Sequence, residues 1–209
     1  MDKSVAKILR QFEARSEKEW RKMGRMDAKE FESHMDEFLL AVGPATGQLI
    51  NLLIKEAKAK NILEVGSSYG YSTVWLAEAA RETGGKVISL EIHPEKQKHA
   101  RDSIKKAGLD GFVDFKLGDA RNSIRKLRKK IDFVLLDLWK DLYIPCFTLF
   151  YPKLKPGAMI VADNMLTPES SRAAAAAYQR HVRAMPGIQS LLLNVGFGLE
   201  LSRVADLNR

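Results

Sequence analysis

Three side chains that can bind a cation, Asp137, Asp163 and Asn164, come at or just after the ends of two apolar segments, IDFVLLD and GAMIVAD. Carboxylate and amide oxygens suit Mg²⁺ or a similarly hard cation. Two buried carboxylates at neighbouring strand ends would repel each other unless a cation lay between them. The alternative is that Asp163 and Asn164 only cap the helix that follows. The pattern therefore favours a metal site over a helix cap.

Lys140 lies three residues after Asp137 in the segment LLDLWKDLY. A divalent cation close to a lysine destabilises the ammonium form, and a neutral lysine can act as a general base. Trp139, the preceding residue, offers a flat face on which a nucleobase can stack. A solvated lysine at the start of a helix and a tryptophan packed in the core are the alternatives for these two residues.

The segment EVGSSYG (64–70) follows the first strong apolar segment of the chain. Its glycines, Gly66 and Gly70, allow a sharp turn and a close approach of the backbone to a ligand. The segment lacks the second glycine of a dinucleotide-binding motif and the lysine of a phosphate-binding loop. It therefore predicts a ligand other than a pyrophosphate or a triphosphate, and a purely structural turn is the alternative.

Two further acidic residues follow the next apolar segments. Glu91 ends KVISLE, where an acid in a nucleotide-binding fold accepts hydrogen bonds from ribose hydroxyls. Asp119, in LGDA, stands where an adenine amino group could donate to it. The alternatives are a solvated strand end for Glu91 and a helix N-cap for Asp119, with Arg121 early in that helix.

Strands and helices that would carry these residues are expected to alternate from residue 60 onwards. Strands are predicted at 61–66, 86–91, 112–118, 131–137 and 157–163, and helices at 47–59, 72–82, 94–107, 121–130, 141–151 and 168–185. The segments 188–194 and 198–204 are predicted to form an antiparallel hairpin that turns at Gly196. The fold class is therefore α/β, with a doubly wound, Rossmann-like, mostly parallel seven-stranded sheet. Ligands of such sheets bind at the carboxyl ends of the strands, where the acidic residues cluster.

The first 40 residues are polar, charged and helix-favouring, with apolar residues at helical spacing and a predicted break at Gly24. Two helices packed on the rest of the chain are expected there. We therefore divide the chain into N-terminal helices at 1–40, acting as a lid or a dimer contact, and a main domain at 41–209.

Length and composition set broader limits. The chain has 209 residues, of which 45% are hydrophobic and 29% charged, so one globular domain with a core is expected. A single cysteine, Cys146, excludes an intramolecular disulfide and a multi-cysteine zinc site. No apolar run approaches the ~18 residues that would span a bilayer, and the first 20 residues are too charged for a signal peptide. We predict a cytoplasmic protein without a membrane association.

The net charge is +8, from 34 Lys and Arg against 26 Asp and Glu. Such a surplus suits an anionic partner such as nucleic acid, or only a solubilising surface. The acids concentrate at the strand ends, whereas the basic residues lie mainly on the predicted helices. Without a nucleic-acid-binding motif, the solubilising surface is favoured, and an anionic small substrate such as a coenzyme A thioester remains compatible.

Four segments together resemble one enzyme family: AVGPATGQ (41–48), ILEVGSSYGYST (62–73), LLDLWKDLY (135–143) and ADN (162–164). The sequence is similar, over about residues 36–204, to the metal-dependent S-adenosylmethionine O-methyltransferases, which include catechol and caffeoyl-CoA O-methyltransferases. One position departs from the catechol enzymes, because Leu138 stands where they carry a histidine beside the adenine.

The resemblance implies a role for each matching residue. The methionine part of S-adenosylmethionine would contact Val42, Gly43, Glu64, Gly66, Tyr69 and Ser72. The ribose would contact Glu91, and the adenine would contact Asp119, Ala120 and Trp139. A divalent metal, Mg²⁺ by preference, would be bound by Asp137, Asp163 and Asn164. Asp137 would also belong to the cofactor site. Lys140 would be the general base, and Glu200 would lie near the second hydroxyl of the acceptor.

The resemblance implies methyl transfer to a hydroxyl of a catechol-like phenolic small molecule, and small relatives of this kind often form homodimers. An RNA or other nucleic-acid methyltransferase is the alternative enzyme, suggested by the basic segment 121–130. A structural or regulatory protein that only binds the cofactor is the non-enzymatic alternative. Such a binder needs none of Asp137, Lys140, Asp163 and Asn164, so their presence together favours the enzyme.

Overall fold

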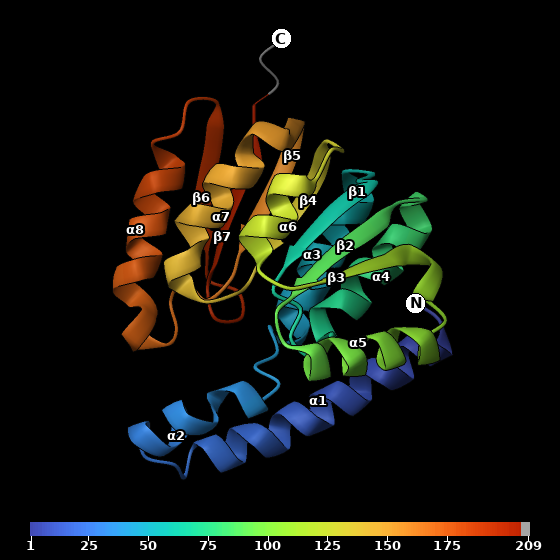
Figure 1. Cartoon of the computed structure of the whole chain (residues 1–209), viewed down its shortest axis with the longest axis vertical. Coiled ribbons are helices and arrows are strands. Elements are labelled where there is room, and N and C mark those ends of the chain that lie inside the picture. The colour runs from blue at the N-terminus through green and yellow to red at the C-terminus, as the bar shows by residue number, and fades with distance from the viewer. Residues whose placement is uncertain (206–209) are drawn as a thin grey trace.

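The computed structural model describes residues 1–205, apart from the side chains at positions 28 and 32. A seven-stranded sheet in the order β3-β2-β1-β4-β5-β7-β6 forms its centre (Figure 1). The strands are β1 (Asn61–Val65), β2 (Lys86–Glu91), β3 (Val113–Leu117), β4 (Ile131–Leu136), β5 (Leu154–Ala162), β6 (Ile188–Leu193) and β7 (Leu199–Val204). The first five are parallel, and β7 runs antiparallel to both β5 and β6. The predicted fold class is therefore confirmed.

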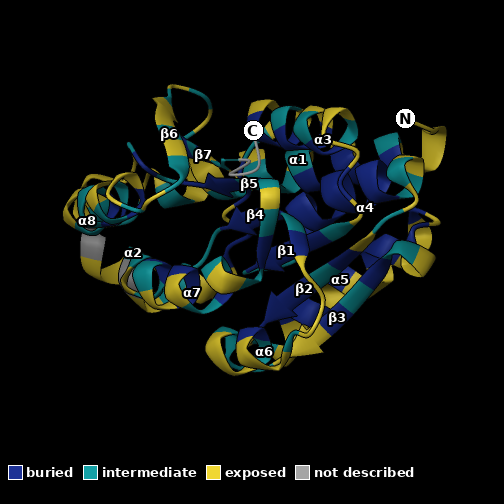
Figure 2. Ribbon diagram, turned by 90° about the horizontal axis from the view of Figure 1, so that it is seen from above, coloured by how far each residue is buried: buried dark blue, intermediate teal, exposed yellow. Residues whose placement is uncertain are grey.

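Helices cover both faces of the sheet, which explains why β4 is almost continuously apolar. They are α1 (Lys3–Met23), α2 (Ala28–His34), α3 (Pro44–Glu56), α4 (Tyr71–Thr83), α5 (Pro94–Lys106), α6 (Ala120–Lys126), α7 (Tyr143–Phe150) and α8 (Arg172–Arg183). One buried cluster joins α1, α3, α4 and α5 to the sheet, and the other joins α6, α7 and α8 to it. Figure 2 shows the buried strands between these two groups.

Strand order and register decide where the site forms. The order reverses at β1, which pairs with β2 on one side and β4 on the other. Val65 pairs with Leu136, and Leu136 pairs with Ala162. The residues after these positions therefore emerge together at one edge of the sheet. In Figure 1 this edge points downwards, towards α1 and α2.

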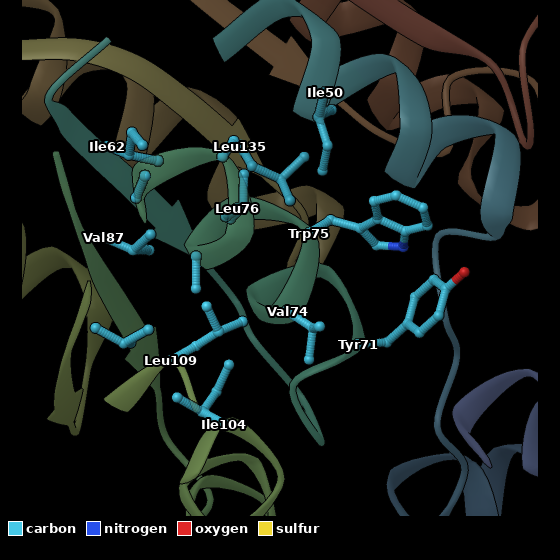
Figure 3. Packing of buried hydrophobic residues seen from close by; sticks show 14 of the residues in the cluster. Ile50, Ile62, Tyr71, Val74, Trp75, Leu76, Val87, Ile104, Leu109 and Leu135 are labelled. Carbon is cyan, nitrogen blue, oxygen red and sulfur yellow. The ribbon is translucent and has the colours of Figure 1, made fainter. Parts of the chain in front are cut away.

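The first helix is built into the core. Its apolar residues Val5, Ile8, Leu9 and Phe12 are buried in the same cluster as the α4 residues Tyr71, Val74 and Trp75, which are labelled in Figure 3. Asp2 caps the start of α1 by accepting a hydrogen bond from the Val5 N–H at 2.9 Å. The helix ends before Gly24, as predicted, and α2 follows with Asp27 as its N-cap.

Several helix and strand ends differ from the predicted ones. The helix expected at 47–59 already begins at Pro44, because Gly43 takes a φ of 82° and proline suits the first helical turn. The helix expected at 121–130 ends at Lys126. A short 3-10 turn, Glu169–Ser171, replaces the first turn of the helix expected at 168–185. Further 3-10 turns are Met35–Glu37, Asp110–Phe112, Lys140–Leu142 and Tyr151–Lys153.

Within the part of the chain that the structure describes, no helix is both long enough and apolar enough to cross a membrane.

Candidate active site

The two predicted metal-binding carboxylates lie side by side at the ends of β4 and β5. The Asp137 N–H donates to the Val65 carbonyl at 3.0 Å, and the Asp163 N–H donates to the Leu136 carbonyl at 3.1 Å. Asp163 is only 1% exposed, yet its Oδ1 atom has no hydrogen-bond partner. Asn164, the next residue, has a φ of 55°. The strand ends thus gather the three predicted oxygen ligands.

Burial dominates the electrostatics of this cluster. It raises the pKa of the Asp163 carboxyl well above its ordinary value, and the charge of Asp137 raises it further. Burial also raises the pKa of Asp137, opposed by the positive charge of Lys140. It lowers the pKa of the Lys140 ammonium, opposed by the two carboxylates. The site therefore disfavours charge on each of these groups unless another charge compensates it.

Lys140 points into the same cluster from the 3-10 turn Lys140–Leu142. Its Nζ donates to the Asn164 Oδ1 at 2.9 Å, to the Tyr143 hydroxyl at 2.5 Å and to the Leu138 carbonyl at 3.3 Å. The alternative of a solvated lysine at a helix start is thereby excluded. A lysine nitrogen in this place could remove the proton of a hydroxyl bound beside it, and its role as a base stays a prediction.

The donor set fits a hard divalent cation. The described residues contain no cluster of three or more His, Cys, Asp or Glu side chains able to hold a metal, so a site here depends on the Asn164 amide as its third protein ligand. Three oxygen ligands leave positions for water and for a substrate, as Mg²⁺ sites commonly do. The unpartnered Oδ1 of Asp163 is an observation that such an ion would account for.

The glycine turn after β1 passes directly beside this cluster. Gly66 has a φ of 91°, and a Cβ atom there would lie 2.0 Å from the Asp137 carbonyl oxygen. The turn leads into a narrow pocket lined by Leu39, Leu40, Ala41, Val42, Ser67, Ser68, Tyr71, Ser72 and Asp137. Three residues predicted to bind the cofactor, Val42, Ser72 and Asp137, therefore share one pocket. The Ser67 hydroxyl in it is buried without a hydrogen-bond partner.

Glu64 supports this pocket from inside the sheet. Its fully buried carboxyl accepts hydrogen bonds from the Ser72, Thr73 and Ser89 hydroxyls at 2.7, 2.8 and 2.6 Å. Burial raises the pKa of Glu64 to about 7, although the three hydrogen bonds oppose the shift. Through Ser72, the carboxyl is tied to the start of α4.

Glu91 is not a solvated strand end, since it is only 7% exposed. Its carboxylate accepts hydrogen bonds from the backbone N–H groups of Ser68, Ile92 and His93, at 2.7, 2.8 and 2.9 Å. The contact with Ser68 joins the end of β2 to the glycine turn. A ribose contact at Glu91 stays a prediction.

Asp119 is the N-cap of α6, which is the alternative that its sequence context left open. It accepts hydrogen bonds from the backbone N–H groups of Arg121 and Asn122. The Arg121 guanidinium also donates to it at 2.6 Å and is the main reason why its pKa falls to about 2. Ala120 is the first residue of the helix. Their contact with adenine also stays a prediction.

The sequence of this chain matches a known protein family. The sequence profile of the O-methyltransferase family matches residues 15–204. This chain belongs to the O-methyltransferase family. The match includes all the predicted site residues and begins inside α1.

Two curated relatives illustrate the similarity of this O-methyltransferase. A catechol O-methyltransferase of Niastella koreensis is 34% identical over 131 residues, which are 61% of this chain and 59% of the relative. Caffeoyl-CoA O-methyltransferase 2 of Populus trichocarpa is 33% identical over 178 residues, 75% of this chain and 72% of the relative. The match thus spans about three fifths of the length of the Niastella protein.

Solved structures resemble the whole fold of this O-methyltransferase. An O-methyltransferase of Bacillus cereus in complex with SAH has a TM-score of 0.76 at 24% identity, covering 98% of this chain and 91% of that chain. A SAH-bound methyltransferase of Podospora anserina has a TM-score of 0.77 at 20% identity, covering 99% and 89%. At these identities the likeness supports the shared fold.

The structure does not bring every predicted residue of this O-methyltransferase to the pocket. The Tyr69 hydroxyl donates to the Glu37 carbonyl at 3.1 Å, and the Arg15 guanidinium lies 3.9 Å from the centre of its ring. Tyr69 thus contacts the N-terminal helices, while its neighbour Ser68 lines the pocket. Trp139 is 45% exposed, so the alternative of a buried tryptophan is wrong, and stacking on adenine stays a prediction.

Glu200 pairs in register with Ala162, the residue before Asp163, and its place beside the acceptor stays a prediction. Its fully buried carboxyl accepts hydrogen bonds from Arg183 at 2.7 and 2.9 Å, from Gln179 at 3.0 Å and from Ser190 at 2.6 Å. These partners belong to α8 and β6, and none is a predicted site residue. Alternate residues of a strand point to opposite faces, and the Glu200 side chain points to the face that α8 covers.

Sequence reasoning missed Tyr143 and Ser67. Tyr143 follows Lys140 by three residues, a spacing at which side chains of a helical turn meet. That spacing is visible in KDLY, but a tyrosine in an apolar helix equally indicates core packing. Ser67 is concealed among the turn residues of EVGSSYG, where its hydroxyl has no distinguishing pattern.

Proposed function

We propose that this protein transfers a methyl group from S-adenosylmethionine to a hydroxyl of a catechol-like phenolic small molecule. The observation that carries the proposal is the cluster of Asp137, Asp163 and Asn164 with the Lys140 amine 2.9 Å from the Asn164 amide oxygen. The catechol and caffeoyl-CoA relatives support an acceptor with vicinal oxygens on an aromatic ring.

Asp137, Asp163 and Asn164 would hold a divalent cation, with Mg²⁺ as the first choice for oxygen ligands. A cation bound there supplies a lower pKa for a coordinated hydroxyl and a fixed position for its oxygen. Two buried carboxyls with raised pKa values would then be held in their ionised form by the positive charge.

Lys140 would remove the proton from the acceptor hydroxyl. Burial lowers the pKa of its ammonium, which favours the neutral amine that a general base requires. The amine donates to the Asn164 amide oxygen just after the end of β5, so it faces the oxygen cluster. Holding a deprotonated oxygen in line with the methyl group of a sulfonium lowers the remaining barrier.

The pocket beside the cluster would bind the cofactor. Val42, Gly43, Gly66 and Ser72 would hold its methionine part, with Glu64 acting behind Ser72. Glu91 would accept from the ribose, and Asp119, Ala120 and Trp139 would flank the adenine. Two observations support this assignment. Val42, Ser72 and Asp137 line one pocket. This pocket lies where the strand order reverses, which is the general ligand position of such sheets.

The N-terminal helices would form a lid over this edge of the sheet. The Leu39 N–H donates to the Glu19 carboxylate of α1 at 2.6 Å, and the Ser68 hydroxyl donates to the Leu39 carbonyl at 3.2 Å. The rings of Trp20 in α1 and Phe197 in the β6–β7 turn lie 5.5 Å apart. These contacts support a lid, while the dimer contact, the homodimer and the cytoplasmic location stay predictions.

A methyl-transfer screen tests the proposal. Catechols, hydroxycinnamate thioesters and flavonoids are incubated with labelled S-adenosylmethionine, with Mg²⁺ or with a chelator. We expect label in a phenolic ether, lost with the chelator and restored by excess Mg²⁺. Asp163→Ala should lose transfer by at least about 100-fold, because an oxygen ligand is missing. It should keep cofactor binding in calorimetry.

Full activity of the wild type in the chelator would contradict the metal-dependent mechanism. Label in RNA, with a steep dependence of binding on salt, would instead support the nucleic-acid enzyme.

A further inference from the structure

The Lys140 amine has more fixed partners than a general base needs. A lysine ammonium has three N–H donors, and here they meet the Leu138 carbonyl, the Tyr143 hydroxyl and the Asn164 amide oxygen. The Leu138 carbonyl is backbone, and Asn164 is already assigned to the cation. Tyr143 is therefore the partner whose function is unexplained.

The hydroxyl of Tyr143 can only accept from Lys140. Its own proton is donated to the Asp163 carbonyl at 3.1 Å, because a backbone carbonyl is only an acceptor. The ring is fully buried and meets Tyr178 edge to face, with centroids 5.4 Å apart. The Lys140 Nζ also lies 4.3 Å from the centre of the Tyr143 ring. The oxygen is thus held in one place and in one orientation.

We propose that Tyr143 is a positioning residue for Lys140: its hydroxyl, fixed by the Asp163 carbonyl, holds the amine against the oxygen cluster at the ends of β4 and β5. The Leu138 carbonyl and the Tyr143 hydroxyl together fix two N–H bonds. The ammonium directs its third N–H to the Asn164 amide oxygen at 2.9 Å. The neutral amine would have its lone pair on this side, where it would take the proton of an acceptor hydroxyl. This inference rests on the proposed function, because it assigns Tyr143 to the base of that reaction.

The neighbouring tyrosine provides a matched control. Tyr178 is equally buried and packs on Tyr143, but its hydroxyl has no hydrogen-bond partner in the structure. Tyr143→Phe and Tyr178→Phe each remove one buried hydroxyl and keep the ring. A purely structural role would therefore give the two variants similar kinetics.

The experiment compares kcat, KM for both substrates and thermal stability of the two variants with the wild type. We expect Tyr143→Phe to lower kcat by at least about tenfold, since a positioned base contributes about 10²–10⁴-fold. Its KM for S-adenosylmethionine should stay within about twofold, and a crystal structure should show a displaced Lys140 amine. Tyr178→Phe should keep kcat within about twofold. Equal kcat values in the two variants would overturn the proposal.

A double mutant separates this inference from the proposed function. In a Lys140→Met background, Tyr143→Phe should leave the residual rate unchanged, because no amine remains to be positioned. An equal fold-loss in both backgrounds would show that Tyr143 acts independently of Lys140 and would overturn the inference. Full activity of Lys140→Met alone would instead contradict the general base of the proposed function.

Discussion

At the scale of single residues, the site is a set of polar side chains that are largely buried from solvent. Glu64 has three hydroxyl donors and no cation beside it, so its charge is stabilised only partly. Asp163 lacks even a hydrogen bond at Oδ1. Such groups cost stability, and proteins keep them where a ligand or a reaction uses them.

The raised pKa of Glu64 makes stability depend on pH. Its pKa rises from 4.5 to about 7 in the folded protein, so the folded state binds a proton that the unfolded state releases in this interval. This contribution is largest below pH 4.5 and is lost as pH rises to 7. Between pH 4.5 and 7, the wild type should therefore lose up to about 3 kcal/mol of its unfolding free energy, at about 1.4 kcal/mol per pH unit. Glu64→Gln should not show this loss, because its side chain does not titrate.

Urea unfolding of the wild type and of Glu64→Gln between pH 4.5 and 7 measures the effect. The difference between their unfolding free energies should shift in favour of the variant as pH rises. A difference independent of pH would contradict the raised pKa. Asp114→Asn serves as a control, because the Asp114 carboxylate in β3 is only partly buried and pairs with Lys116.

At the scale of elements, the 3-10 turn Lys140–Leu142 and helix α1 have the greatest effect on how the site is built and covered. The turn brings Lys140 and Tyr143 to the end of β5, although both residues follow β4. The helix α1 lies beneath the carboxyl edge in Figure 1 and packs its apolar face on α4 and α5. It is therefore a part of the core as well as a candidate lid.

Truncation of Phe12 tests whether α1 unfolds with the rest of the protein. Phe12 is 3% exposed and meets the Tyr71 and His99 rings with centroids 5.9 and 5.6 Å apart. Phe12→Ala should lower the free energy of unfolding by about 3–5 kcal/mol. The exposed neighbour Gln11 provides the control, and Gln11→Ala should change it by less than about 0.5 kcal/mol.

Fluorescence and circular dichroism should report the same urea transition in each variant. A small early transition assigned to α1, with an unchanged main transition, would show that α1 folds separately from the sheet.

At the scale of the whole molecule, the parallel strands bring distant segments to one edge. The glycine turn, Glu91 and the ends of β4 and β5 are separated by up to about 100 residues in the chain but share contacts there. A ligand that spans this edge would connect elements from both halves of the sheet. Binding should therefore stabilise the whole fold instead of one loop.

Thermal unfolding with S-adenosylmethionine measures this coupling. A ligand at 100 times its Kd adds about 2.7 kcal/mol to the folded state, which raises the Tm of a protein of this size by about 5–10 °C. Glu91→Ala should lose most of this shift, because the ribose loses its carboxylate partner. Asp114→Ala should keep it, and a full shift in Glu91→Ala would contradict the ribose contact.

The sequence by itself determined the fold class, the alternation of strands and helices, and the metal and base candidates. It could do so because apolar segments, glycine turns and terminal acids recur at local spacings that reflect backbone geometry. The structure differs from these predictions in the ends of helices and in the directions of side chains. Asp119 turned out to cap α6, and the helix expected from 121 to 130 stops at Lys126.

Only the tertiary structure decided which side chains face the site. Tyr69 turns to Arg15 and Glu37, Glu200 turns to Arg183, and Tyr143 donates to the Asp163 carbonyl. Each direction depends on partners that are distant in the sequence or on the face of a strand that packing buries. Local spacing carries no information about such partners, because they are chosen when buried polar groups satisfy their hydrogen bonds in the folded chain.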